Sequence, residues 1–244
     1  MDATPPQADS EFDEFASDYE QSLDQGLRIT GENKDYFANH RVAWLVSQLS
    51  PIRDTIRFIL DFGCGTGTSS RYLNSAIQPS HYLGFDPSSA SIDVARLTYP
   101  KERVTFTSDS TDIPISQVDL AFTNGVFHHI PIDQRAKAAS IVWNSLKPGA
   151  HFAFWENNRW NPMVHFLMSR VPFDQDAHML FPHQARRLLI DAGFEIVLTD
   201  YLFVFPAAFK WLRHLEPSLC KLPLGGQYLV LARKPIPSPL TSAA

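Results

Sequence analysis

Short apolar runs alternate with helix-like segments along most of the chain beyond residue 50. Apolar runs that end in a polar or glycine-rich turn are typical of parallel strands buried on both faces. The runs that we expect to be strands are 58–60, 82–85, 104–106, 118–123, 151–155, 194–205 and 227–232. Helices are expected over 68–75, 88–97, 132–146 and 182–192. This alternation predicts an α/β protein with an open, doubly wound parallel sheet that helices cover on both faces.

The first fifty residues follow a different pattern. Phe12, Phe15 and Tyr19 lie at positions i, i+3 and i+7, which places them on one face of a helix. A second helix is expected to begin near residue 36 and to end near Ser50 and Pro51. We therefore divide the chain into an acidic, helical N-terminal segment (1–50), a main domain (51–234) and a flexible tail (235–244).

The most specific pattern is the sequence Asp-Phe-Gly-Cys-Gly-Thr-Gly at 61–67, between the first expected strand and the helix that follows it. Its three glycines allow a tight turn and let a ligand press against the backbone. In a doubly wound sheet this turn lies at the carboxyl edge of the strands, where ligands bind. Asp86 ends the next strand, and a carboxylate there can accept hydrogen bonds from both hydroxyls of a ribose.

Two classes of nucleoside cofactor combine a glycine turn with a ribose-binding acid. A dinucleotide site has the spacing Gly-x-Gly-x-x-Gly and presents a helix start to a pyrophosphate. This chain has Gly-x-Gly-x-Gly instead, and Asp61 beside it would repel a pyrophosphate. The Gly-Lys-Ser/Thr of a nucleoside triphosphate loop is absent. The pattern therefore favours a nucleoside with a sulfonium and an amino-acid tail.

Five segments of the chain resemble, in order, the class I S-adenosylmethionine-dependent methyltransferases: ILDFGCGTG, LGFDPS, TSDSTDIP, VDLAFTNGVFHHI and LKPGAHFAFWE. They span about residues 55–156, and GQYLVLARK resembles the last strand of that fold. The resemblance implies a Rossmann-like, seven-stranded sheet of order 3-2-1-4-5-7-6 with an antiparallel last strand and an N-terminal helical lid. It also implies that S-adenosylmethionine is the methyl donor and S-adenosylhomocysteine the product.

The resemblance also assigns cofactor contacts by position. The loop residues that would back the methionine part are Gly63, Cys64, Gly65 and Gly67. For Cys64, a small residue in a tight loop is the favoured alternative. Asp61 would hold the amino group, directly or through water, and Asp86 the ribose. The other expected contacts are Pro87, Asp109 and Ser110 at the adenine, Asn124 and Gly125 at the sulfonium, Tyr19 in the lid and Arg41 at the carboxylate. A packed helix with a solvated Arg41 is an open alternative.

The candidate catalytic residues are His128, His129 and Glu156, which follow the fourth and fifth strands. A histidine with a pKa near ~6.5 suits removal of a proton from the acceptor. Either histidine could instead cap the next helix or orient the loop, and the sequence does not choose between them. Glu156 could bind an acceptor hydroxyl, assist as a base or order the loop.

Two further segments bear on the acceptor. The connection 157–181 is too long for a simple turn, so we expect it to form part of an acceptor-binding cap. Asp174 and Asp176 have the spacing of a metal pair, but no third ligand is apparent and we expect no metal. The aromatic segment 201–215 could line an apolar acceptor pocket, form a dimer face or touch a membrane, although core packing is the favoured interpretation.

Composition narrows the choice of partner and compartment. The net charge of -5 is uneven, because residues 1–35 hold ten acidic and two basic residues and the rest sixteen acidic and nineteen basic. This balance argues against a nucleic-acid partner. The acidic start lacks a basic-then-apolar signal, no apolar run has transmembrane length, and the two cysteines suggest no disulfide framework. We expect a cytoplasmic monomer or homodimer, with peripheral membrane contact still open.

The sequence therefore predicts an enzyme that transfers a methyl group from S-adenosylmethionine to a small or amphiphilic organic acceptor. Oxygen is the favoured acceptor atom, ahead of nitrogen or carbon. A regulatory or scaffold protein that binds S-adenosylmethionine without turnover is the alternative. A nicotinamide oxidoreductase is disfavoured by the glycine spacing and Asp61.

Overall fold

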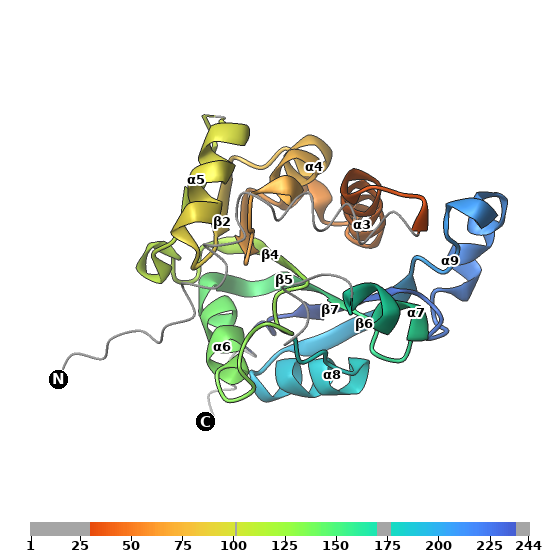
Figure 1. Ribbon diagram of the computed structural model, residues 1–244. Helices are drawn as coiled ribbons and strands as arrows, with labels where there is room; N and C mark the ends of the chain where they lie inside the picture. The colour runs from red at the N-terminus through yellow and green to blue at the C-terminus, as the bar shows by residue number, and fades with distance from the viewer. Residues whose placement is uncertain (1–29, 101, 170–176, 238–244) are drawn as a thin grey trace, which may run out of the picture.

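The computed structural model describes residues 30–100, 102–169 and 177–237, which fold around one seven-stranded sheet of order β3-β2-β1-β4-β5-β7-β6 (Figure 1). The strands are β1 (Phe58–Phe62), β2 (His81–Phe85), β3 (Val104–Thr107), β4 (Val118–Asn124), β5 (Leu146–Asn157), β6 (Glu195–Leu202) and β7 (Gln227–Arg233). Strands β1 to β5 pair in parallel, and β7 is antiparallel to both β5 and β6. The predicted fold and strand order are confirmed.

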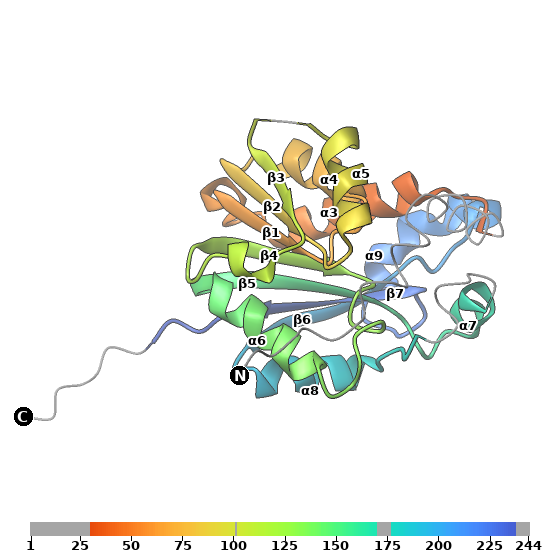
Figure 2. The ribbon, with the colours of Figure 1, turned by 60° about the vertical axis from the view of Figure 1, so that its left-hand side comes forward.

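Helices cover both faces of the sheet. Those longer than a single turn are α3 (Lys34–Gln48), α4 (Thr68–Ile77), α5 (Ser89–Thr98), α6 (Arg135–Ser145), α7 (Pro162–Met168) and α8 (Pro182–Asp191). Figure 2 shows α3, α4 and α5 on one face and α6 and α8 on the other. Residues 1–29, and with them Tyr19 and the first expected helix, lie outside the described residues, as do Asp174 and Asp176.

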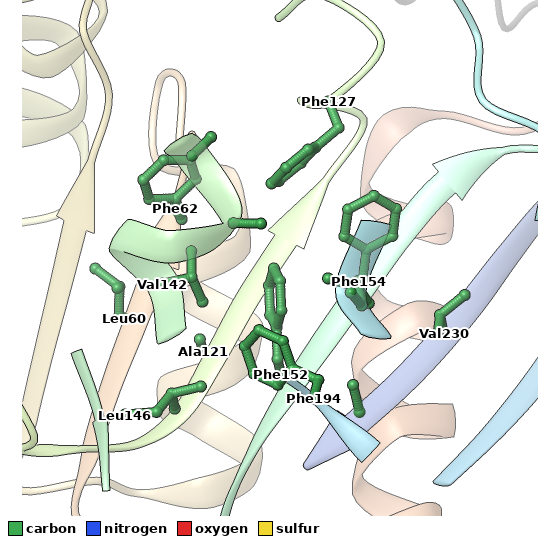
Figure 3. Packing of buried hydrophobic residues seen from close by; sticks show 14 of the residues in the cluster. Leu60, Phe62, Ala121, Phe127, Val142, Leu146, Phe152, Phe154, Phe194 and Val230 are labelled. Carbon is green, nitrogen blue, oxygen red and sulfur yellow. The ribbon is translucent and has the colours of Figure 1, made fainter. Parts of the chain in front are cut away.

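Two hydrophobic clusters join these layers to the sheet. The α3 side buries Val42 and Leu45 of α3 with Trp155 of β5 and Leu229 of β7. On the other side, aromatic residues dominate, and Phe152 is fully buried between Phe154 and Phe194 (Figure 3). Because α3 shares a cluster with central strands, it is held firmly against this face of the sheet.

Local signals explain several of the boundaries. The Ser88 hydroxyl accepts a hydrogen bond from the Ser91 amide and caps α5, as its position predicts. Gly193 follows α8 at φ +101, where a Cβ atom would lie 3.2 Å from Trp143. Glycine is therefore required there by both conformation and space.

Core packing, the favoured interpretation of the aromatic segment 201–215, holds only at its start: Tyr201 and Leu202 are buried in the two clusters, whereas residues 203–215 are not buried. β6 ends at Leu202, and a 3₁₀ segment η5 (Ala207–Leu215) and a short helix α9 (Glu216–Leu219) follow it. No residue of η5 is buried, and Phe209 and Trp211 are 51% and 68% exposed. The physical reason is that Glu216 accepts the backbone N–H groups of 203, 204 and 205, which takes them out of the sheet.

The structure also bears on the expected cap and on membrane and metal sites. Helix α7 begins the expected cap connection 157–181. Among the described helices, none has the length and apolar character needed to cross a membrane. Within the same residues, no cluster of three or more histidine, cysteine or acidic side chains could hold a metal ion.

Candidate active site

The glycine loop connects β1 to α4 at the carboxyl edge of the sheet. The amides of Gly63 and Cys64 donate to the Phe85 carbonyl at 2.7 and 2.9 Å, which ties the loop to the end of β2. Gly63 and Gly65 have φ of +76 and +51. A Cβ atom at Gly63 would lie 2.3 Å from Val126, whereas a Cβ at Gly65 would enter open space. The missing side chain of Gly63 thus lets the loop pack directly against Val126, and that of Gly65 leaves the backbone open to a ligand.

A pocket lies above this loop. Its walls come from α3, the β1–α4 connection and the end of β4, and its lining residues are Lys34, Ala38, Arg41, Asp61, Gly63, Cys64, Gly65, Thr66, Thr68, Ser69 and Asn124. The Oδ1 atom of Asn124 is buried and has no hydrogen-bond partner among the residues that the structure describes. A buried amide oxygen without a donor is costly, so a donor supplied by a ligand or water fits this position.

Asp61 is the buried acid of this pocket, with an exposed fraction of 2%. The Tyr82 hydroxyl donates to its Oδ2 at 2.5 Å. Burial raises the pKa of Asp61 to about 7; the Tyr82 hydrogen bond opposes this shift, Asp86 adds to it, and Arg41 lowers it. The carboxyl is therefore poised to ionise when a cationic group arrives.

The charged groups that line the pocket are complementary to the ammonium and carboxylate groups of a free α-amino acid. Asp61 and the Asn124 oxygen are suited to an ammonium group, while Lys34 and Arg41, from α3, are suited to a carboxylate. Arg41 is only 8% exposed, so the alternative of a solvated arginine is wrong. A nucleoside with an amino-acid tail fits this set of donors and acceptors, whereas a diphosphate would face the carboxyl of Asp61.

Asp86 lies beside the loop rather than in the pocket lining. Its carboxylate accepts the Gly65 amide at 2.8 Å and the Ser88 amide at 3.0 Å. Asp86 is half-buried and Pro87, next to it, is exposed. The ribose contact expected of Asp86 stays a prediction, and its observed contacts show that it also fixes the loop.

The residues expected at the adenine are exposed. Asp109 caps the short 3₁₀ turn η3 (Ser110–Asp112) and accepts both the amide and the hydroxyl of Thr111, which lower the pKa of Asp109. Ser110 begins that turn. Neither lines the described pocket, so their adenine contacts remain predictions.

His128 and Glu156 form a buried pair at the ends of β4 and β5. Nδ1 of His128 lies 2.6 Å from Oε2 of Glu156, and the two side chains are 3% and 0% exposed. The other oxygen of Glu156 accepts the Phe127 amide at 2.8 Å. With both oxygens engaged inside the fold, Glu156 orders the histidine loop, which was one of the open interpretations.

His129 is half-buried, and its ring centroid lies 4.1 Å from that of His128. The loop is further tied to the last part of the connection 157–181: the His178 amide donates to the His128 carbonyl at 2.8 Å. Arg135 donates to the carbonyls of Ile130 and His178. The histidine loop after β4 and the last part of the connection 157–181 are thus joined by hydrogen bonds.

Sequence reasoning missed part of this site. Thr66 of the glycine motif lines the pocket together with Thr68 and Ser69, which follow the motif directly, so their position next to the glycines was an available signal. Lys34 and Ala38 carry no motif. They enter the pocket because α3 packs beside α4, which a local pattern does not show.

Comparison with known proteins agrees with this geometry. The family described as "Methyltransferase domain" matches residues 60–152. A trans-aconitate 2-methyltransferase of Escherichia coli (strain 55989 / EAEC) is 27% identical over 216 residues, covering 81% of this chain and 83% of the relative.

Solved structures share the fold. An S-adenosylmethionine-dependent methyltransferase from Archaeoglobus fulgidus aligns with a TM-score of 0.61 at 16% identity, over 83% of this chain and 95% of that one. A chain of the complex between the Haloferax volcanii Trm112 methyltransferase activator and a methyltransferase aligns with a TM-score of 0.64 at 19% identity, over 92% and 98%. The sheet order, the pocket chemistry and these matches agree: residues 60–152 match a methyltransferase domain, and the chain resembles S-adenosylmethionine-dependent methyltransferases of known structure in its fold.

Proposed function

We propose that this methyltransferase moves the methyl group of S-adenosylmethionine to an oxygen atom of a small or amphiphilic organic acceptor, by in-line displacement. The observation that carries the proposal is the buried His128–Glu156 pair, because His128 lies in the loop that follows Asn124, the end of β4 that lines the pocket. A group able to accept a proton is thereby placed next to the cofactor pocket.

The cofactor, when bound, supplies a methyl group already activated by the adjacent sulfonium. The residues of this chain have the tasks of orientation, exclusion of water and proton removal. In the neutral tautomer of His128 that donates from Nδ1 to Glu156, Nε2 is the ring atom able to accept a proton. Glu156 fixes this tautomer and stabilises the imidazolium that forms when the acceptor hydroxyl gives up its proton.

The acceptor class is supported by the relatives. Trans-aconitate, the compound in their name, is a small polycarboxylate. An ionised carboxylate is an oxygen nucleophile without a proton, so its methylation needs no base, whereas a hydroxyl acceptor does. Met163 and Phe166 on α7 are exposed and would offer an apolar surface to an acceptor with an apolar part.

A radiolabelled-methyl assay tests the function. The purified protein would be incubated with methyl-labelled S-adenosylmethionine and panels of small carboxylic acids, alcohols or phenols, and amines. We expect label on an oxygen acceptor, and alkaline hydrolysis would release methanol from an ester but not from an ether. Transfer confined to amines would refute the oxygen assignment, and cofactor binding without any transfer would favour the regulatory alternative.

Glu156→Gln separates the two oxygen chemistries. The amide cannot stabilise an imidazolium as a carboxylate does, so for a hydroxyl acceptor we expect kcat to fall about 10- to 100-fold, with the KM for S-adenosylmethionine unchanged. For a carboxylate acceptor kcat should stay within a few-fold. The pH dependence of kcat provides the second readout, because a loss that is equal at every pH would indicate a purely structural role.

A further inference from the structure

Gln227 lies at the edge of the sheet that carries the active site. Because β7 runs antiparallel to its neighbours, its first residue lies where β5 and β6 end. The register pairs Gln227 with Asn157, the last residue of β5, and with Leu202, the last residue of β6. This is the edge at which β1 and β4 deliver Asp61 and Asn124 to the pocket.

A directed chain of hydrogen bonds runs through Gln227. Nη1 of Arg41 donates to Oε1 of Gln227 at 2.9 Å, and Nε2 of Gln227 donates to Oδ1 of Asn157 at 3.1 Å. The Asn157 amide nitrogen then donates to the sulfur of Met168 in α7 at 3.5 Å. A guanidinium has only donors, so it fixes the orientation of the first amide, and that amide fixes the second.

The chain links the cofactor side of the site to the acceptor side. Arg41 lines the pocket from α3, and α7 begins the cap. The backbone amide of Asn157 also donates to Oε2 of Glu156 at 3.3 Å, the oxygen that contacts His128. In this series of hydrogen bonds, Gln227 is the residue that connects Arg41 of α3 to Asn157 at the end of β5.

We propose that Gln227 is a positioning residue, which holds Arg41 in place for the carboxylate of the cofactor's amino-acid part. A guanidinium whose orientation is already fixed loses less rotamer freedom when a carboxylate binds it. A neutral amide provides this hold without neutralising the positive charge, whereas a glutamate would compete with the ligand carboxylate. The inference rests on the cofactor orientation described above, with its amino-acid part in the pocket.

Gln227→Glu tests this role through two ligands. S-adenosylhomocysteine carries the amino-acid part, and 5′-methylthioadenosine shares the thioether nucleoside but lacks it. By calorimetry we expect the Kd of S-adenosylhomocysteine to rise at least about tenfold, as for a lost charge-assisted contact, and that of 5′-methylthioadenosine to change less than about twofold. Gln117→Glu is the matched control: Gln117 is exposed and precedes β4 at the opposite edge, so both affinities should be unchanged.

The outcomes separate the proposal from its premises. Equal weakening of both ligands, or no weakening of either, would overturn the role of Gln227. In an Arg41→Gln background, Gln227→Glu should add no further loss, and an additive loss would show that Gln227 does not act through Arg41. A wild-type protein that binds 5′-methylthioadenosine but not S-adenosylhomocysteine would instead contradict the orientation of the cofactor. Thermal unfolding of each variant verifies that it is folded.

Discussion

At the scale of single residues, the site depends on buried polar groups whose state changes when a ligand binds. Asp61 is the clearest of these, because burial holds its pKa at about 7. The unpartnered Asn124 oxygen lies in the same pocket. Both features suit a ligand that brings a positive charge and N–H donors, and the ionisation of Asp61 predicts a response to pH.

Cofactor affinity should increase with pH through the ionisation of Asp61. An ammonium group binds the carboxylate better than the acid, so we expect the affinity for S-adenosylhomocysteine to rise about tenfold between pH 5.5 and 7.5. Asp61→Asn keeps the shape but cannot ionise, so its affinity should be weak and nearly independent of pH. A pH dependence in Asp61→Asn equal to that of the wild type would contradict the assignment.

The unliganded protein provides the complementary measurement. The pKa of Asp61 is raised by folding, so the stability associated with its protonated form is complete below the unfolded value of about 4 and is lost as pH rises through about 7. Asp61→Asn avoids this loss. In denaturant unfolding without ligand, the free energy of unfolding of the variant should therefore increase relative to that of the wild type between pH 5 and 8.

At the scale of elements, the end of β6 shows how one side chain stops a strand. Phe203 has φ +66, and the next backbone N–H groups turn toward the carboxylate of Glu216, at 3.1 to 3.3 Å. The apolar run continues to Phe205, but the sheet hydrogen bonds do not, because β7 begins opposite Leu202. Because residues 203–205 donate to Glu216 and leave the sheet, the aromatic residues of η5 that come after them are exposed.

Glu216→Ala should loosen this corner. Three partly buried N–H groups would lose their acceptor, and we expect unfolding free energy to fall by about 1–3 kcal/mol. Hydrogen exchange should accelerate at 203–205 more than in the central strands. Glu216→Gln retains one acceptor oxygen and should give an intermediate effect, while unchanged exchange in Glu216→Ala would show that the carboxylate does not hold the corner.

At the scale of the whole molecule, the two hydrophobic clusters differ in their position relative to the active site. The cluster on the α3 side lies under the pocket, since α3 supplies Lys34 and Arg41. The aromatic cluster around Phe152 lies on the other face of the sheet, against α6 and α8 (Figure 3). Loss of packing there should affect stability more than ligand binding.

Phe152→Ala tests this separation. Phe152 is fully buried, and removal of its ring should cost about 3–5 kcal/mol, with a fall in Tm of roughly 6–20 °C. At a temperature where the variant is folded, its Kd for S-adenosylhomocysteine should stay within about threefold of the wild type, because Phe152 lies on the face of the sheet opposite the pocket. The exposed Ile132→Ala is the control, and a large loss of affinity in Phe152→Ala alone would show that the two faces are coupled.

The sequence by itself determined the order of strands and helices, the glycine turn and the acids at the ends of β1 and β2. These features are local: strand runs, caps and glycine turns depend on neighbouring residues and on backbone geometry, which the sequence records directly. For the same reason Ser88 and Gly193 were predictable as helix boundaries. The end of β6 was not, because its acceptor, Glu216, comes from a later segment of the chain.

Only the tertiary structure decided which distant residues meet. Arg41 and Gln227 are 186 positions apart, and they touch because β7 runs antiparallel and so places its first residue, not its last, at the active edge. A search for residues at strand ends misses such a position. Burial is decided in the same way, since the pKa of Asp61 and the pairing of Glu156 with His128 depend on the layers packed around them.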